Sequence, residues 1–161
     1  MNGREEDRGA PPRFFADAML GSLARWLRTL GADVEYDSRI DDSTLIQRAI
    51  KEGRIILTRD TRLAKRKVFK DICVFIEKDS VDEQLRQVAG RFRIGMSGFL
   101  TRCLRCNALL EAALKTSVRD NVPPYVYETQ GEFSRCARCG RVYWGGTHRE
   151  RMLEELSRML G

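Results

Sequence analysis

The stretch RFFADAMLGSLARWLRTLGADVEY, residues 13–36, predicts a strand, a helix and a second strand in direct succession. Its first five residues (13–17) have the apolar centre of a short buried strand. Leucines then recur at steps of three and four, at positions 20, 23, 27 and 30, which predicts a helix that ends at Gly31. Asp33-Val-Glu-Tyr36 predicts the second strand. Such a unit implies a right-handed crossover between parallel strands.

The same alternation continues for the next sixty residues or so. Asp42 or a neighbour caps a second helix with a buried stripe at Leu45, Ile46, Ala49 and Ile50, and Gly53 ends it. Residues 54–58 predict a third strand, a short basic helix follows, and residues 72–76 predict a fourth strand. A capping box from Ser80 to Glu83 opens a further helix. The pattern predicts an α/β domain over residues 13–95, with a parallel sheet flanked by helices.

Two C-x-x-C pairs follow this domain, Cys103 with Cys106 and Cys136 with Cys139. Four thiolates complete the tetrahedral shell of a zinc ion. The alternatives are two disulfides or a redox pair. We favour structural zinc and a cytoplasmic protein, because no secretory signal precedes the chain and cytosolic thiols stay reduced. We expect a zinc ribbon over residues 100–148. The fifth cysteine, Cys73, lies in an apolar run and is expected to be a small buried hydrophobe.

Residues 149–161 predict an amphipathic terminal helix whose apolar face packs back on the protein. Residues 1–12 predict a disordered leader. The chain has no apolar run near the ~20 residues of a membrane span, so we expect no membrane partner.

The net charge of +6 favours a polyanionic partner. Basic residues concentrate in the segment 59–70, which holds six of them and one acid. This segment is either a solvated helix face or a surface that contacts phosphates. The candidate phosphate ligands are Arg59, Arg62, Lys65, Arg66 and Lys67.

Aspartates occur where the predicted strands end. Asp17 ends the first strand, Asp37 follows the second, Asp42 begins the next helix, and Asp60 comes two residues after Thr58. In open α/β sheets, ligands bind beyond the carboxyl ends of the strands. Each aspartate alone could be a cap or a turn residue, but convergence of three favours a site for Mg²⁺ or Mn²⁺. Such an ion activates water for attack on a phosphodiester.

Other common chemistries are not indicated. His148 is the only histidine, so neither a Ser-His-Asp triad nor a Cys-His pair can be assembled convincingly. The chain also lacks the G-x-x-x-x-G-K-[ST] loop of P-loop NTPases.

Several of these segments together resemble the Mut-seven C-terminal ribonuclease family. They are FADAMLGSLARWLR (15–28), LTRD (57–60), RCLRCN (102–107), CGRVYWGGTH (139–148) and Arg151-Met152. The resemblance implies a PIN-like nuclease domain joined to a zinc ribbon, with RNA as substrate.

The resemblance also assigns site residues. It places metal-binding acids at Asp17 and Asp60. The stretch DSTLIQRA (42–49) is similar to a pattern of related PIN-like proteins, which makes Asp42 the third acid. Asp37 is a candidate for the fourth without a motif to support it.

The leading hypothesis is therefore a metal-dependent endoribonuclease with structural zinc and catalytic Mg²⁺ or Mn²⁺. The alternative from another class is a non-catalytic RNA-binding adaptor, in which the ribbon and the basic helix bind RNA and the acids only cap helices. A third hypothesis is a toxin-type nuclease with an antitoxin partner. The sequence identifies no protein partner.

Overall fold

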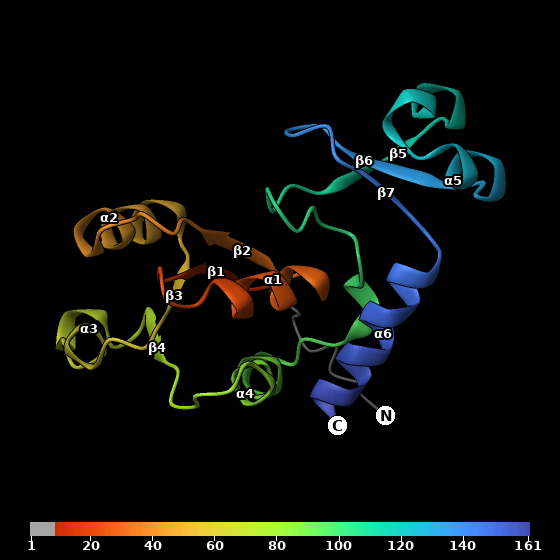
Figure 1. Ribbon diagram of the computed structural model, residues 1–161. Coiled ribbons are helices and arrows are strands. Elements are labelled where there is room, and N and C mark those ends of the chain that lie inside the picture. The colour runs from red at the N-terminus through yellow and green to blue at the C-terminus, as the bar shows by residue number, and fades with distance from the viewer. Residues whose placement is uncertain (1–8) are drawn as a thin grey trace, which may run out of the picture.

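The computed structural model of the protein describes residues 9–161, and Figure 1 shows them as a parallel sheet with its helices, a smaller antiparallel sheet and a long terminal helix. Residues 1–8 of the predicted leader lie outside the described residues, and residues 9–12 have no regular structure. None of the helices in residues 9–161 is long and apolar enough to cross a membrane.

The first part of the chain alternates between strands and helices as predicted. All four of its strands are parallel, in the order β2-β1-β3-β4. The elements are β1 (Arg13–Ala16), α1 (Gly21–Thr29), β2 (Asp33–Tyr36), α2 (Asp42–Glu52), β3 (Ile55–Thr58), α3 (Thr61–Ala64), β4 (Cys73–Phe75) and α4 (Val81–Phe92).

This strand order creates a switch point at the centre of the sheet. From β1 the chain crosses to β2 on one side, and from β3 it crosses to β4 on the other. The carboxyl ends of β1 and β3 therefore lie side by side where the chain direction diverges. In open α/β sheets this is the position at which ligands bind.

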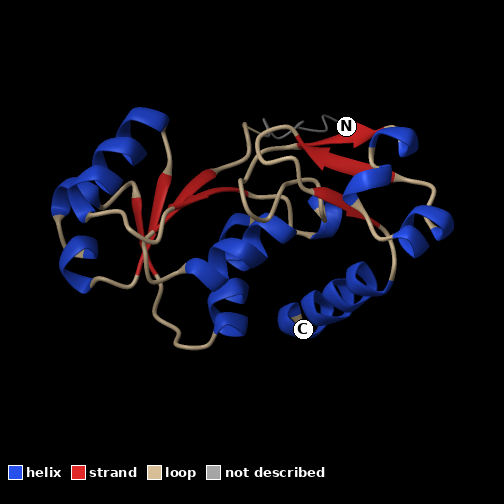
Figure 2. Ribbon diagram, turned by 45° about the horizontal axis from the view of Figure 1, so that its top comes forward, coloured by secondary structure: helices blue, strands red, loops and turns tan. Residues whose placement is uncertain are grey.

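Helices cover both faces of the sheet, as Figure 2 shows. One face carries α1 and α4, whose core includes Leu23, Leu27 and Leu85. The other face carries α2 and α3, where Leu45 and Leu63 pack on the sheet. The regularly spaced apolar residues of each helix thus pack against one face of the sheet, and the predicted α/β architecture is confirmed.

Helix ends follow the predicted cap chemistry. The N-cap of α2 is Asp41, which accepts a hydrogen bond from the backbone N–H of Thr44 at 2.9 Å, and Asp42 is the first helical residue. The capping box at α4 is confirmed, since the Ser80 hydroxyl accepts from the N–H of Glu83. The expected burial of Ile50 is wrong, because its side chain is 59% exposed.

The second part of the chain is a three-stranded antiparallel sheet in the order β5-β6-β7. Its own small core contains Val118, Val126 and Phe133. The elements are β5 (Leu110–Ala113), α5 (Pro124–Thr129), β6 (Phe133–Cys136) and β7 (Val142–Trp144), with short 3-10 turns at Lys115–Ser117 and Arg119–Asn121.

The terminal helix α6 (Thr147–Leu160) begins two residues before its predicted start and returns to the first part of the chain. It packs against α4 (Figure 1), and Leu156 and Met159 are buried in the core that α1 and α4 share. The expectation that its apolar face packs back on the protein is confirmed. Leu153, on the same helix, is 37% exposed.

Candidate functional site

Asp17 stands at the switch point, at the carboxyl end of β1. Its backbone N–H donates to the carbonyl of Leu57 on β3 at 2.9 Å, so the ladder between the strands extends to this residue. The side chain is only 8% exposed, and its carboxylate accepts hydrogen bonds from Met19 N–H, the Thr58 hydroxyl and Arg59 N–H. These donors hold the carboxylate in one position.

Asp60 is joined to Asp17 through Thr58. The Thr58 hydroxyl donates to Oδ2 of Asp17 at 2.6 Å and accepts from the backbone N–H of Asp60 at 3.0 Å. Asp60 also caps α3, because its Oδ1 accepts from Arg62 N–H at 2.8 Å. Thr58 was missed by sequence reasoning, although its place at the end of a strand, two residues before an acid, was the available signal.

Asp37 and Asp42 lie at the same edge of the sheet but are more exposed. Tyr36 pairs with Ala16 across β2 and β1, so Asp37 follows β2 beside the position that Asp17 takes after β1. Asp37 closes a turn by accepting from Arg39 N–H at 2.9 Å. Asp42 is exposed in the first turn of α2, next to the capping residue Asp41.

The aspartates do not form a preassembled cluster. Within the described residues, the four cysteines are the only group of three or more His, Cys, Asp or Glu whose ligand atoms lie close enough to share an ion. A magnesium ion, however, is usually held by one or two carboxylates together with waters and substrate phosphates. Asp17 and the neighbouring Asp60 offer the one or two carboxylates that such a site needs, and their assignment as catalytic residues stays a prediction.

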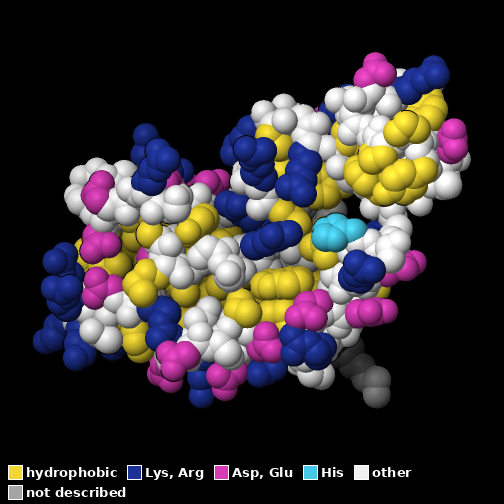
Figure 3. Space-filling view, viewed as in Figure 1, with side chains coloured by type: hydrophobic (Ala, Val, Ile, Leu, Met, Phe, Trp, Pro, Cys, Tyr) yellow, Lys and Arg dark blue, Asp and Glu magenta, His cyan; other side chains and the backbone are white. Residues whose placement is uncertain are grey.

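The predicted phosphate ligands fall into two groups. Arg62, Lys65, Arg66 and Lys67 are exposed on α3 and the 3-10 turn after it (Lys67–Phe69), at the left edge of Figure 3, where Lys and Arg side chains gather. Arg59 instead turns back toward the loop before α4. Its guanidinium donates to the carbonyls of Ile76 and Lys78 and pairs with Asp79 at 2.7 Å, so it holds that loop.

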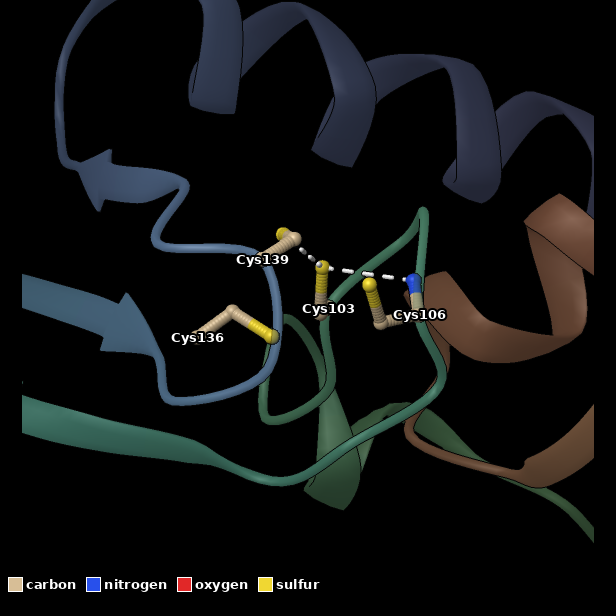
Figure 4. A group of neighbouring side chains, drawn as sticks. All are labelled: Cys103, Cys106, Cys136 and Cys139. Atoms are coloured by element: carbon tan, nitrogen blue, oxygen red, sulfur yellow. Dashed lines mark hydrogen bonds between the residues drawn. The ribbon is translucent and has the colours of Figure 1, made fainter.

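The four cysteines of the two C-x-x-C pairs come together as predicted (Figure 4). Their Sγ atoms all lie within 4.8 Å of one another, and those of Cys103 and Cys139 are 3.7 Å apart. A tetrahedral zinc ion with Zn–S bonds of ~2.3 Å separates its sulfurs by ~3.8 Å. All five cysteines are free, so the disulfide alternative is not observed. Cys73 is half-buried against the core under α2 and α3.

Hydrogen bonds favour the thiolate form of Cys103. Burial opposes ionisation of Cys103, but hydrogen bonds from the Tyr143 hydroxyl and from Cys106 N–H outweigh it and lower the pKa of Cys103 to about 7. Burial and the neighbouring sulfurs raise the pKa of Cys106 to about 12. Four thiolates this close need a cation to offset their repulsion, which is what a zinc ion supplies.

Hydrogen bonds join the loop of the first cysteine pair to the parallel sheet. The Arg28 guanidinium donates to the carbonyl of Val34 at 2.8 Å and to that of Leu104 at 3.0 Å. Asn107, which has a left-handed φ of 66°, accepts from Val34 N–H at 2.9 Å and donates to Asp33 at 2.7 Å. The cysteine loop therefore covers β2, the strand at the edge of the sheet. In the sequence, Asn107 stood out only as the last residue of the segment RCLRCN (102–107), and its role in this contact was not predicted.

The fold and its sites define an α/β protein with acids at the switch point of a parallel sheet and with a C-terminal ribbon built on four cysteines. The chain belongs to the family of the Mut7-C RNAse domain, whose model matches residues 12–156, nearly the whole chain. This membership indicates nuclease activity with RNA as substrate, and it confirms the resemblance found in the sequence. A comparison with curated proteins found no match.

Proposed function

We propose that the protein is a metal-dependent endoribonuclease with a PIN-like domain, and that it cleaves RNA at the carboxyl edge between β1 and β3. The observation that carries this proposal is the pairing of Asp17 and Asp60 through Thr58 at the switch point of the sheet. Two acids held together at the position where parallel sheets bind ligands are suited to a hard divalent cation. Membership in an RNase domain family supports RNA as the substrate.

Asp17 and Asp60 would hold the ion, each in a different way. Asp17 is nearly buried and fixed by three donors, so it supplies a rigid negative charge. Asp60 is partly exposed at the start of α3 and is free to turn one oxygen outward. A bound Mg²⁺ or Mn²⁺ would supply an activated water and neutralise charge on the phosphate. Asp37 and Asp42 lie along the same edge, and their negative charge would help to attract the cation.

The exposed cations after Asp60 would hold the RNA backbone. They follow the acid directly in the chain, so phosphates bound by Lys65, Arg66 and Lys67 lie next to the proposed cleavage site. This contact is electrostatic and does not depend on sequence, because phosphates carry no base information. We do not assign Arg59 this role, because its guanidinium is engaged by the loop before α4.

We propose that the ribbon holds zinc through its four cysteines in a structural role. All four positions of the tetrahedral shell are filled by protein sulfurs, whereas catalytic zinc keeps a position open for water or substrate. Zinc would make the ribbon rigid, and the ribbon would then add to the RNA-binding surface beside the parallel sheet.

The proposal is tested with zinc-loaded protein on a mixture of RNAs, with Mn²⁺ added or omitted. We expect cleavage only with the added metal. The Asp17→Asn, Asp60→Asn double variant should lose cleavage by orders of magnitude and retain RNA binding, because the basic segment remains. An Asp71→Asn, Asp120→Asn variant changes two exposed acids elsewhere and should cleave normally. Full activity of the first double variant would refute the mechanism, and binding without cleavage by the wild type would favour the adaptor.

A further inference from the structure

A groove lies between α1 and α6, and none of the four cysteines lines it. Its volume is about 440 Å³, within the range of small-ligand pockets. Figure 3 looks onto this side of the molecule, where the histidine side chain lies among Lys and Arg side chains. The groove is lined from α1 by Ser22, Arg25 and Trp26, and from α6 by His148, Arg151 and Glu155.

Helical spacing directs these side chains to the groove. Positions 22, 25 and 26 share one face of α1, and positions 148, 151 and 155 share one face of α6. The two walls are more than a hundred residues apart in the chain. They meet because Leu156 and Met159 anchor α6 in the core that it shares with α1 and α4.

The charge of the groove is positive. Neither Arg25 nor Arg151 forms an ion pair within residues 9–161. The one acid in the lining, Glu155, is paired with Arg158 on its own helix at 2.5 Å. Two exposed guanidinium groups thus remain available to an anionic ligand.

Trp26 gives the groove that these cations line a flat apolar surface. Its indole is half-buried against the core under α1, so the ring is supported from below and open on the groove side. Cations beside an exposed aromatic ring are the pattern with which proteins hold single-stranded nucleic acid, since bases stack on the ring and phosphates pair with the cations. Base-paired strands cannot stack their bases in this way.

The groove also leads to the edge that carries the acids. Ser22 is in the first turn of α1, which follows Asp17 after a tight turn closed by a 3.0 Å hydrogen bond from Leu20 N–H to the Asp17 carbonyl. A strand that lies along α1 toward its N-terminus therefore arrives at Asp17.

We propose that the groove between α1 and α6 is a binding subsite for single-stranded RNA. A base stacks on Trp26, adjacent phosphates pair with Arg25 and Arg151, and the imidazole of His148 contributes a further hydrogen bond. The subsite is separate from the acidic edge and from the basic segment after Asp60, and binding there does not require cleavage.

The test measures anisotropy of a labelled 12-nucleotide oligouridine with zinc-loaded protein and no added Mg²⁺ or Mn²⁺. The Arg25→Gln, Arg151→Gln variant should bind about tenfold more weakly, and the slope of log K against log salt should fall by about 1.4, because two fewer phosphates are neutralised. A Lys51→Gln, Arg91→Gln variant removes two exposed helical cations outside the groove and should leave both values nearly unchanged.

Trp26 is tested in two ways, because its ring also supports the core. Trp26→Phe should retain binding and Trp26→Leu should weaken it about tenfold, in variants that melt as cooperatively as the wild type. In a Trp144→Phe background, the fluorescence of Trp26 should be quenched by oligouridine. The proposal would be overturned if the Arg25→Gln, Arg151→Gln variant had the same affinity and salt slope as its control. It would also be overturned if an RNA duplex bound as tightly as oligouridine and its binding did not change in Trp26→Leu.

Discussion

Thr58 donates its hydroxyl hydrogen to Asp17 across 2.6 Å at the buried end of β3. The same oxygen accepts from the backbone of Asp60, so one small side chain connects the two acids of the proposed cleavage site. A valine at this position has nearly the same shape and neither hydrogen bond.

We therefore expect Thr58→Val to lower the free energy of unfolding by about 1–3 kcal/mol, because a carboxylate loses a donor in a buried setting. Cleavage should fall as well, since the spacing of the two acids is no longer fixed. Urea denaturation and an RNA cleavage assay measure the two effects. Thr116→Val, at an exposed position, is the matched control, and equal losses in the two variants would contradict the assignment.

Neutralising Lys65, Arg66 and Lys67 together should weaken RNA binding and reduce the salt slope by about 2, because each single-strand phosphate contact contributes about 0.7. Binding titrations at several salt concentrations measure this. A variant with Arg13, Lys51 and Arg91 neutralised changes as many exposed charges elsewhere. A salt slope like that of this control would assign the basic segment to a solvated face.

Cys103→Ser should abolish the zinc site, which we expect to hold one ion per chain in the wild type. Elemental analysis should find the metal absent, and hydrogen exchange should find the amides of residues 100–146 unprotected. The amide of Val34 should lose protection with them, because its acceptor is Asn107. Cys73→Ala removes the cysteine that lies outside the cluster and should keep the zinc. Zinc retained by Cys103→Ser would disprove the four-sulfur site.

The terminal helix offers a stability test with an internal control. Leu156 is fully buried, so Leu156→Ala should cost about 2–5 kcal/mol through lost burial and the cavity left behind. Leu153→Ala, on the same helix, should cost less than about 1 kcal/mol because Leu153 is partly exposed. Denaturation of the full chain measures both, and similar costs would show that α6 is not packed as described.

The loss of folding stability at acid pH should depend on Asp33. Burial acts to raise the pKa of Asp33, but hydrogen bonds from Arg54 and Asn107 prevail and lower it below its usual value. A lowered pKa in the folded state gives stability above about pH 4, which is lost as the pH falls below that value. Asp33→Asn should reduce the loss of melting temperature between neutral and acid pH, and Asp71→Asn should not change it.

The sequence predicted most of the α/β part because its signals are local. The leucine spacing of α1, the αL glycine at position 53 and the capping box of α4 each depend on a few neighbouring residues. The cysteine cluster was predictable for another reason, since zinc chemistry fixes which four residues must meet.

Long-range polar contacts were not predictable in this way. The pairing of Arg28 with Leu104 and of Asn107 with Val34 depends on how two parts of the chain dock. The groove between α1 and α6 has the same origin, because its walls are brought together by the burial of Leu156 and Met159. Thr58 was missed because threonine at the end of a strand is common and its role appears only when both acids are in place.

The contact between Asn107 and β2 has a consequence for the newly made chain. The parallel sheet and helices α1 to α4 are complete in sequence once residue 92 has left the ribosome, yet β2 still has an open edge and α6 has not been made. An open edge is a template for pairing with other chains until it is covered. Here the edge of β2 is covered by the loop of the first cysteine pair, and the shape of that loop depends on the zinc ion we propose. The supply of zinc during synthesis would then set how long each new molecule is exposed to aggregation.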